Sequence, residues 1–309
     1  MSVLSIVVPC YNEEETIPVF YQQVCEYQNR IDAELEFCFV DDGSTDQTLS
    51  VLKKLREQDN RIHYASFSRN FGKEAALLAG LEISSGDYVV TMDVDLQDPP
   101  SLLPEMYEIV ADSSGEYDSV ATRRMDRTGE PPLRSFFARQ FYRIINRLSS
   151  TEIVDGSRDY RMMTRQVADA VINDREYNRF SKGIFSWVGF RTRWIDYHNV
   201  ERSAGSTKWS FSTLFKYSVE GILAYSTVPL VISSCLGILM CIGSLIALLY
   251  SILRNVFGAS PFETWSSFIC ILIFTSGLIL LSLGVIGLYI SRIYLETKKR
   301  QIYIIREQA

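Results

Sequence analysis

Two long stretches near the C-terminus contain no Asp, Glu, Lys or Arg: residues 226–253 and residues 264–291. Each is long enough to cross a bilayer as an α-helix, which takes about 20 apolar residues. Only residues 254–263 separate them, so we expect an antiparallel helical hairpin whose two ends lie on one side. Basic residues at 292 and 298–300 follow the second stretch. Because short segments rich in Lys and Arg stay in the cytoplasm, that side is predicted to be cytoplasmic.

The composition limits what else the chain can do. Its 309 residues exceed one average domain, and a net charge of −6 gives no basic excess of the kind that binds nucleic acid. The six cysteines show no Cys-x-x-Cys spacing and are interpreted as buried residues in a reducing compartment. Two histidines are too few for a His-based metal site. The apolar start at Val3–Val8 is too short for a signal peptide and lacks a basic flank.

Residues 2–125 alternate between segments of strand and helix character, which predicts a mostly parallel sheet covered by helices on both faces. No Gly-x-Gly-x-x-Gly follows the first strand and no Walker-type loop is present, so both of these nucleotide-binding signatures are absent. Ser44 and Gln47 resemble a capping box for the second helix. The expected strands are 4–8, 35–40, 62–66, 88–92 and 119–122, and the expected helices are about 14–30, 44–57, 73–83 and 101–111.

Two amphipathic segments precede the charge-free stretches. Residues 133–150 carry an apolar stripe at helical spacing and place Arg139, Arg143 and Arg147 on another face. Such a helix can lie on an anionic membrane surface or can pack on the sheet with a solvated arginine face, and the stretches downstream favour the membrane. A second apolar helix at about 209–225 leads directly into the first stretch and is expected to be interfacial.

Asp93 and Asp95 directly follow the strand expected at 88–92. In open α/β sheets, ligands bind at the carboxyl ends of the strands. Two carboxylates at such an end suit Mg²⁺ or Mn²⁺, which typically takes one or two carboxylates together with substrate phosphate oxygens. Asp-x-Asp is a common sequence, so a simple polar turn is the alternative interpretation.

Three further polar segments are expected at the same rim of the sheet. Pro9-x-Tyr11-Asn12-Glu13 follows the first strand, Asp41-Asp42 follows the second, and residues 155–161 follow the amphipathic helix. One carboxylate can accept hydrogen bonds from a base N–H or from ribose hydroxyls, while the Asp93 pair holds a metal that neutralises a diphosphate. Each segment alone is also explained by an ordinary turn. Their order and positions together predict one pocket.

This set of motifs resembles the family 2 glycosyltransferases, which have a GT-A-type, Rossmann-like nucleotide-sugar domain. More narrowly, the chain resembles polyprenyl-phosphate (bactoprenol- or undecaprenyl-phosphate) glycosyltransferases and the related dolichol-phosphate mannose synthases. The resemblance covers nearly the whole length. Its motifs are Val-Val-Pro-Cys-Tyr-Asn-Glu at 7–13, Val-Asp-Asp-Gly-Ser-Thr-Asp at 40–46, Ser-Arg-Asn-Phe-Gly-Lys at 68–73, Asp-Val-Asp-Leu-Gln-Asp-Pro-Pro at 93–100, and the C-terminal hairpin.

The resemblance implies a role for individual residues. The residues implied to hold the nucleoside are Pro9, Tyr11, Glu13, Val40 and Asp42. Those implied to hold the diphosphate and a Mg²⁺ or Mn²⁺ ion are Asp93, Asp95 and Gln97, with Asp93 and Asp95 as the metal ligands. Asp159 matches the residue regarded as the catalytic base in the family, and the basic residues implied to face phosphates are Arg123, Arg202 and Lys208.

Asp159 stands between Arg158 and Arg161 in the sequence, and nearby positive charge favours an ionised carboxylate. A phosphomonoester has a second pKa near 6, so such an acceptor is already largely dianionic at pH 7. We therefore expect Asp159 mainly to position the acceptor and to take a proton only at lower pH. A structural salt bridge with Arg158 or Arg161 is the alternative.

The activity implied by the resemblance is inverting transfer of a single sugar, glucose or N-acetylglucosamine, from a UDP-sugar to polyprenyl phosphate at the cytoplasmic membrane face. The product would be a lipid-linked sugar donor for cell-envelope glycosylation. Processive relatives carry Gln-x-x-Arg-Trp, but Phe190 occupies the Gln position before Arg193-Trp194, and two spans are too few for a polymer channel. The alternatives are a transferase acting on a membrane lipid hydroxyl and a non-catalytic membrane adaptor with a degenerate nucleotide-sugar fold.

The expected organisation follows from these features. Residues 1–207 form a cytoplasmic GT-A domain, residues 208–226 an interfacial helix, and residues 227–309 a transmembrane hairpin, at about 227–253 and 264–291, with a cytoplasmic tail. The protein is thus expected to be a multi-pass cell-membrane protein with both termini in the cytoplasm. Its expected partners are the donor, the acceptor and the bilayer, and homo-oligomer formation through the hairpin is left open.

Overall fold

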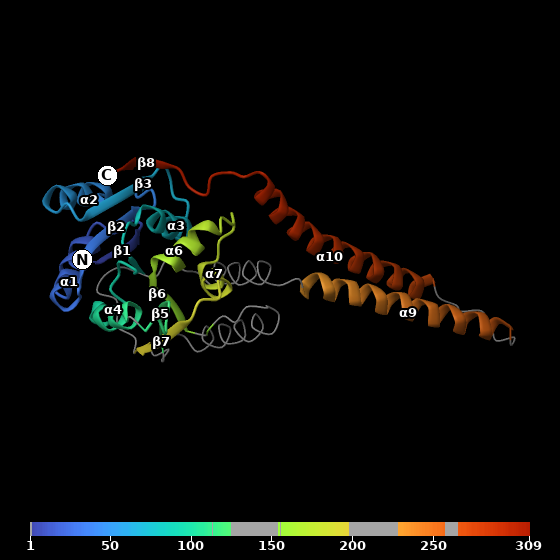
Figure 1. The fold of residues 1–309 in the computed structure, drawn as a ribbon. Coiled ribbons are helices and arrows are strands. Elements are labelled where there is room, and N and C mark those ends of the chain that lie inside the picture. The colour runs from blue at the N-terminus through green and yellow to red at the C-terminus, as the bar shows by residue number, and fades with distance from the viewer. Residues whose placement is uncertain (1, 113, 125–153, 155, 198–227, 257–264) are drawn as a thin grey trace.

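The computed structural model describes residues 2–112, 114–124, 154, 156–197, 228–256 and 265–309. Strands from these residues form one eight-stranded sheet in the order β7-β5-β6-β4-β1-β2-β3-β8 (Figure 1). Helices pack on both of its faces, which is the α/β arrangement expected from the sequence. The predicted helices at 133–150 and 209–225, together with Arg202 and Lys208, lie outside the described residues.

The first four strands form the parallel part of the sheet. β1 (Ser2–Cys10) pairs in parallel with β2 (Ala33–Asp41) and with β4 (Tyr88–Thr91), and β2 pairs in parallel with β3 (Ile62–Phe67). The strands are rich in apolar residues because both of their faces are covered. Since these strands run in the same direction, the loops that follow them leave from the same edge of the sheet, the one formed by the carboxyl ends of the strands.

The helices of this part agree closely with the sequence prediction. Helical character expected at 14–30 divides into an α-helix and a short 3₁₀ turn, and the helix expected at 101–111 begins with another such turn. The bounds are α1 (Thr16–Cys25), η1 (Gln28–Arg30), α2 (Thr48–Gln58), α3 (Lys73–Ile83), η2 (Pro100–Leu102) and α4 (Leu103–Ala111).

The predicted capping box at Ser44 and Gln47 is wrong. α2 begins at Thr48 after Gln47 as N-cap, the Gln47 side chain makes no capping hydrogen bond, and the N–H of Thr48 donates to Asp46 Oδ1 at 3.0 Å. The Ser44 hydroxyl oxygen instead accepts a hydrogen bond from the backbone N–H of Asn12 at 2.9 Å. The hydroxyl thus joins two loops at the sheet edge, a long-range contact that outweighs the local capping pattern.

The second part of the sheet reverses direction. β6 (Ser157–Thr164) is antiparallel to both β4 and β5 (Ser119–Arg124), and β7 (Thr192–Tyr197) is parallel to β5. Two helices connect β6 to β7, α6 (Arg165–Asn173) and α7 (Ser181–Trp187). Thr91 at the end of β4 pairs with Arg161, so the start of β6 lies beside the residues that follow β4. The reversal therefore brings Asp159 to the edge where Asp93 lies.

Successive residues of the strands pack into different layers. Ile6 joins a cluster with α1 and α4, whereas its neighbour Val7 joins a cluster with α3, α6 and α7. Gly80 of α3 lies so close to the sheet that a Cβ atom there would come within 2.3 Å of Val7 Cγ1. This close packing fixes α3 on the sheet and holds its first residues at the edge of the strands.

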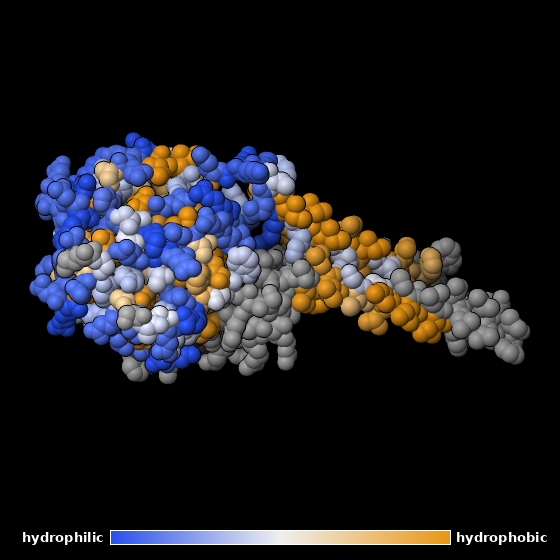
Figure 2. Space-filling view, in the orientation of Figure 1, coloured by the Kyte–Doolittle hydropathy of each residue, from blue (hydrophilic) through white to orange (hydrophobic). Residues whose placement is uncertain are grey.

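Two long helices extend away from the sheet, α9 (Val228–Val256) and α10 (Trp265–Thr297), and they contact each other (Figure 1). Many of their apolar side chains are exposed, as Figure 2 shows. Within the described residues, one segment, Phe274–Thr297, is long and apolar enough to cross a membrane, and α9 contributes a shorter apolar stretch, Leu230–Met240. So much exposed apolar surface is unusual for a protein surrounded by water.

The chain ends in a strand that was not predicted. β8 (Ile305–Gln308) pairs antiparallel with β3 and is an outermost strand of the sheet. Glu307 accepts a hydrogen bond from the Tyr64 hydroxyl at 2.9 Å and pairs with Lys53 at 2.6 Å, while the Tyr303 ring stacks on Phe67 with centroids 4.9 Å apart. Part of the expected C-terminal tail after the second long helix therefore belongs to the α/β sheet.

Candidate active site

The loops after β1 and β2 are joined by hydrogen bonds. Asn12 has a positive φ of 55°, a conformation that Asn tolerates better than most residues, and its side-chain oxygen accepts a hydrogen bond from the N–H of Thr45 at 2.8 Å. The N–H of Glu13 donates to the Thr48 hydroxyl at 2.9 Å, and the Glu13 carboxylate accepts from Thr16 at 2.6 Å. The two loops predicted to bind the nucleoside are thus held together at this edge of the sheet.

The two aspartates after β2 have different surroundings. Asp41 accepts hydrogen bonds from the Ser44 N–H (2.9 Å) and the Ser66 hydroxyl (2.7 Å), so it organises the turn. Asp42 is 4% exposed and accepts hydrogen bonds from the backbone N–H groups of Phe71 (2.6 Å) and Gly72 (2.9 Å). Burial raises the pKa of Asp42 to about 6, although those two N–H groups act to lower it.

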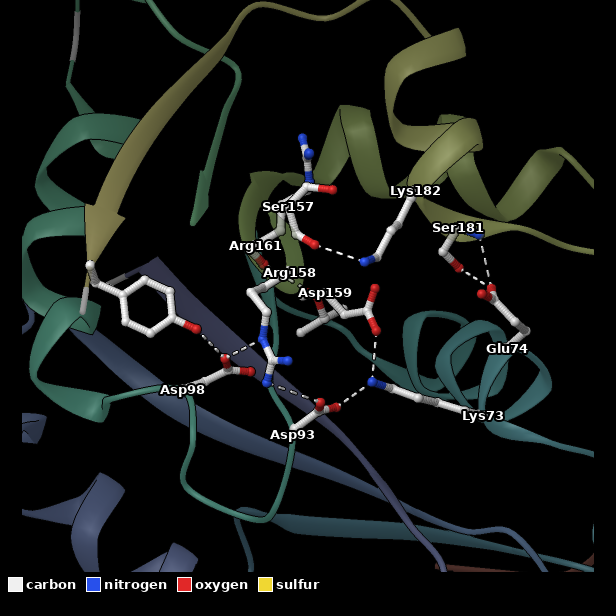
Figure 3. A network of polar contacts seen from close by, with 12 residues as sticks. Lys73, Glu74, Asp93, Asp98, Ser157, Arg158, Asp159, Arg161, Ser181 and Lys182 are labelled. Carbon is white, nitrogen blue, oxygen red and sulfur yellow. Dashed lines mark hydrogen bonds and ion pairs between the residues drawn. The ribbon is translucent and has the colours of Figure 1, made fainter. Parts of the chain in front are cut away.

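A lysine connects the two acidic motifs of the edge (Figure 3). Lys73 is the first residue of α3, and its Nζ lies 2.6 Å from Asp93 Oδ1 and 2.7 Å from Asp159 Oδ2. Burial acts to raise the pKa of Asp159, but Lys73, Lys182 and Arg158 outweigh it and hold that pKa below its usual range. The carboxylate of Asp159 is therefore ionised at neutral pH, as predicted.

An arginine connects Asp93 to a second, fully buried carboxylate. Arg158 Nε donates to Asp98 Oδ1 at 3.2 Å, and an NH2 atom of the same guanidinium lies 3.9 Å from Asp93 Oδ2. The Tyr197 hydroxyl also donates to Asp98 Oδ1 at 3.0 Å, whereas Asp98 Oδ2 is buried with no hydrogen-bond partner. Burial raises the pKa of Asp98, and the charge of Arg158 opposes that rise.

The first turn of α7 also lies at this site and contacts α3 and β6. Glu74, next to Lys73, accepts hydrogen bonds from the N–H (3.0 Å) and the hydroxyl of Ser181 at the start of α7. Lys182 Nζ donates to the carbonyl oxygen of Ser157 at 2.7 Å. The first turn of α3 therefore fixes both Asp159 and the helix that leads into β7.

The alternative interpretation of Asp159, a salt bridge with Arg158 or Arg161, is not the contact that the structure shows. Arg158 contacts Asp98 and Asp93, as described above. Arg161 is buried, donates to Ser119 (3.2 Å) and Thr192 (3.3 Å), and its guanidinium carbon lies 4.6 Å from the centre of the Phe185 ring. Burial lowers the pKa of Arg161 to about 10. The cation in direct contact with Asp159 is Lys73.

The other predicted site residues are spread along the edge. Pro9 and Val40 are paired neighbours at the ends of β1 and β2, with Val40 fully buried and Tyr11 in the loop that follows. Asp95 lies in the turn after β4, and its Oδ1 accepts a hydrogen bond from the N–H of Gln97 at 3.2 Å. Arg123 donates to Asp196 on β7 at 2.7 and 2.9 Å. Arg123 therefore contacts a carboxylate of β7 rather than Asp93 or Asp159.

Sequence reasoning did not assign a role to Lys73, Glu74 or Asp98. A signal for Lys73 was present, because it ends the Ser-Arg-Asn-Phe-Gly-Lys motif and follows β3, whose end shares the edge with β1, β2 and β4. The contact between Lys73 and Asp159 could not be predicted, since it depends on the reversed direction of β6.

The chemistry of the donor atoms fits a hard divalent cation. Asp93 and Asp95 offer carboxylate oxygens, and the ammonium of Lys73 shows that a positive charge is accommodated against Asp93. Among the described residues, no group of three or more His, Cys, Asp or Glu side chains is gathered to hold a metal ion. The protein would thus supply two carboxylates, and the remaining ligands would come from a diphosphate and water, as is usual for Mg²⁺ sites.

Comparison with known proteins finds relatives that align with nearly the whole chain. The bactoprenol glucosyl transferase homolog of an Escherichia coli K12 prophage is 38% identical over 98% of this chain and 98% of its own length. The bactoprenol glucosyl transferase of Shigella phage SfV is 38% identical over 99% of this chain and 98% of its own length. A solved structure, mannosyl-3-phosphoglycerate synthase from Rubrobacter xylanophilus, superposes over 72% of each chain with a TM-score of 0.49 and 16% identity.

A sequence profile described as "Glycosyl transferase family 2" matches residues 5–172, which include most of β1, all of β2 to β6, the Asp93 turn and most of α6. This match spans more than half of the chain, and the two relatives align over nearly all of it. The chain therefore belongs to glycosyl transferase family 2.

Proposed function

We propose that this glycosyltransferase moves a single sugar from a UDP-sugar to polyprenyl phosphate at the cytoplasmic membrane surface, with inversion at the anomeric carbon. The observation that carries the proposal is the contact of one ammonium with both Asp93 and Asp159. It brings the carboxylate assigned to the donor diphosphate next to the carboxylate assigned to the acceptor. The names of the relatives, bactoprenol glucosyl transferases, support this acceptor and favour glucose as the sugar.

Different residues at this edge bind the nucleoside, the cation and the phosphates. The loops after β1 and β2 bind the nucleoside, with Asp42 as the hydrogen-bond acceptor. A Mg²⁺ or Mn²⁺ ion bound by Asp93 and Asp95 would neutralise charge on the departing diphosphate. Gln97 in the same turn supports that group, and Arg123, Arg202 and Lys208 are the proposed phosphate ligands. Positive groups held at this edge stabilise the charge that develops as the bond to the sugar breaks.

Asp159 acts mainly by positioning the acceptor. A carboxylate whose pKa is held below its usual range by Lys73 is a weak base. The proposed acceptor does not require a strong one, because a phosphomonoester is largely dianionic at pH 7. An acceptor hydroxyl would instead require a base with a raised pKa. The electrostatics of Asp159 therefore favour a phosphate acceptor over a lipid hydroxyl.

The two long helices are proposed to anchor the site in the membrane as a hairpin. β7 precedes α9 in the chain, β8 follows α10, and both strands belong to the same sheet. The segment between them must therefore begin and end on one side of a bilayer. If α10 crosses the membrane, the chain must also cross in the other direction, and among the described residues between β7 and α10, α9 is the long helix available for that crossing.

A turnover assay tests the proposed function. The purified full-length protein, in vesicles with a short polyprenyl phosphate, is incubated with radiolabelled UDP-glucose, UDP-N-acetylglucosamine and UDP-galactose. Transfer to the polyprenyl phosphate from one donor, but not to diacylglycerol, is the expected result. Labelled diacylglycerol would indicate the hydroxyl-acceptor alternative, and nucleotide binding without any turnover would indicate a non-catalytic adaptor.

Removing the cation ligands should have the largest effect on that assay. Asp95→Asn replaces a carboxylate with a neutral amide, a poorer ligand for a hard cation, and is expected to abolish transfer while leaving the fold intact. EDTA should have the same effect on the wild-type protein, and added Mn²⁺ should reverse it. Full turnover under either condition would remove the metal from the mechanism.

Labelling of single cysteines tests the membrane arrangement. A cysteine at position 260, between the two charge-free stretches, should react with an impermeant maleimide on intact cells. A cysteine at position 308, next to the end of β8, should react only after the cells are opened. The opposite pattern would place the sheet outside the cytoplasm, away from nucleotide sugars, and would contradict the proposed function.

A further inference from the structure

The position of Lys73 has a consequence for how the two halves of the site communicate. Its Nζ lies 2.6 Å from Asp93 Oδ1, an oxygen of a proposed cation ligand. A Mg²⁺ ion would lie about 2.1 Å from a ligand oxygen. An ammonium and a divalent cation so close together repel each other strongly. A cation that binds through Asp93 must therefore displace the ammonium or be displaced by it.

Of the three cations Lys73, Arg158 and Lys182, Lys73 has the side chain that can move. Arg158 is held by Asp98, which is fully buried, and Lys182 is held by the backbone carbonyl of Ser157. The side chain of Lys73 is 39% exposed, and its flexible four-carbon stem ends in a compact charge with rotatable donors. After release from Asp93, the ammonium still has Asp159, at 2.7 Å, as its partner.

We propose that Lys73 is a positioning residue that couples cation binding at Asp93 to the placement of Asp159. Without the cation, Lys73 holds both carboxylates and competes for the metal site. When the cation and donor bind, Asp93 is released, and the ammonium stays beside Asp159, where it meets the phosphate of the acceptor. The donor side of the site is thereby coupled to the acceptor side.

This inference rests on the proposed function, in particular on a cation at Asp93, and it predicts opposite effects on two measurements. Lys73→Met removes the competing charge, so we expect Mn²⁺ to bind the nucleotide-free protein about tenfold more tightly, within the usual range of coupling between sites. The same variant should turn over more slowly, because Asp159 has lost its partner. A residue with a merely structural role would weaken both binding and turnover.

The binding experiment is isothermal titration of Mn²⁺ into the full-length protein, with thermal unfolding as the check on folding. Lys182→Met is the matched control: it removes the same charge from the same corner but not from Asp93, and its Mn²⁺ affinity should stay within about twofold of wild type, well short of the coupling expected at Lys73. Lys73→Arg keeps the charge and should not tighten Mn²⁺ binding. Equal or weaker Mn²⁺ binding by folded Lys73→Met would overturn the inference.

Two further measurements keep the outcomes distinct. Asp93→Asn should abolish the tight Mn²⁺ site in the wild-type and Lys73→Met backgrounds, and its failure to do so would overturn the cation assignment as well. If Lys73→Met does not fold, the inference is tested on the wild-type protein by measuring the rate of chemical acetylation of Lys73 with mass spectrometry. Mn²⁺ should accelerate acetylation of Lys73 as the ammonium leaves Asp93, and an unchanged rate would contradict the inference while leaving the proposed function in place.

Discussion

Asp42, which is buried, and Asp159, which is partly buried, lie at the same edge of the sheet but are held by different kinds of group. Asp42 accepts hydrogen bonds from two backbone N–H groups, which are neutral dipoles. Asp159 contacts the full positive charge of Lys73, with Lys182 and Arg158 also acting on it. Burial raises the pKa of Asp42 to about 6, whereas the pKa of Asp159 is held below its usual range.

The difference shows what each half of the site can do near neutral pH. Dipoles only partly offset the loss of water, so Asp42 is close to changing its protonation state. Full charges more than offset that loss, so Asp159 stays ionised over the whole physiological range. We infer that the donor side responds to pH through Asp42, and that the acceptor side depends on an intact set of charges.

Breaking a buried ion pair on the acceptor side should have the largest effect on stability. Arg158→Met leaves Asp98, which is 0% exposed, without its cation. Loss of one partner of a buried pair typically costs about 3–5 kcal/mol in the free energy of unfolding. Denaturant unfolding of the full-length protein in detergent, followed by circular dichroism, measures the change.

Two variants serve as controls for that experiment. Arg158→Met combined with Asp98→Asn removes the charge left behind and should recover most of the lost stability. Arg123→Met breaks the exposed pair with Asp196 and should cost less than about 1 kcal/mol. If Arg158→Met lowers the free energy of unfolding no more than Arg123→Met does, Asp98 is already neutral and does not form an ion pair with Arg158.

Asp159→Asn tests the acceptor side by its activity. We expect turnover to fall by about a hundredfold, the loss that a misplacement of a reactant by about 1 Å can cause. The sequence predicted that Asp159 takes a proton at lower pH, which would make this defect shrink between pH 6 and pH 8. With its pKa held low by Lys73, the defect should instead be constant over that range. A defect that shrinks with rising pH would restore a role as base.

The sequence was sufficient to predict the parallel part of the sheet. β1, β2, β3 and β4 are apolar runs bounded by polar turns, and such patterns are local. The Asp42 and Asp93 loops follow from the same reasoning, because parallel neighbours end at one edge. Lys73 could have been included on that argument, since its loop follows β3.

The remainder of the site depends on contacts between distant segments. The direction of β6 is set by its pairing with β4 and β5, and no local pattern in residues 157–164 reveals it. The addition of β8 to β3 joins segments about 240 residues apart, and Ser44 bonds to Asn12 rather than capping its own helix. Sequence reasoning therefore identified Asp42, Asp93 and Asp159, but neither the buried Asp98 nor the contact of Lys73 with Asp93 and Asp159.

The smallest expected effect concerns Asp42 and the pH dependence of donor binding. Above a pKa of about 6 the carboxylate is ionised and can accept a hydrogen bond from the nucleoside, and below it the proton occupies that position. The folded-state pKa lies above the ordinary value of 3.8, so this group favours the folded state fully below about pH 4, and that contribution is lost as the pH rises through 6. Ionised Asp42 thus costs the fold about 3 kcal/mol at pH 7.

Calorimetric titration of a UDP-sugar from pH 8 to pH 5 measures the consequence for binding. A UDP-sugar is preferable to UDP, because the terminal phosphate of UDP would itself titrate near pH 6. We expect the affinity to be nearly constant above pH 7 and to fall by about tenfold at pH 5, one unit below the pKa of Asp42. Asp42→Asn should bind more weakly at pH 8 and lose the pH dependence, because its amide does not titrate. An equal fall in the variant would assign the effect to another group, and a flat wild-type profile would show that Asp42 does not contact the donor.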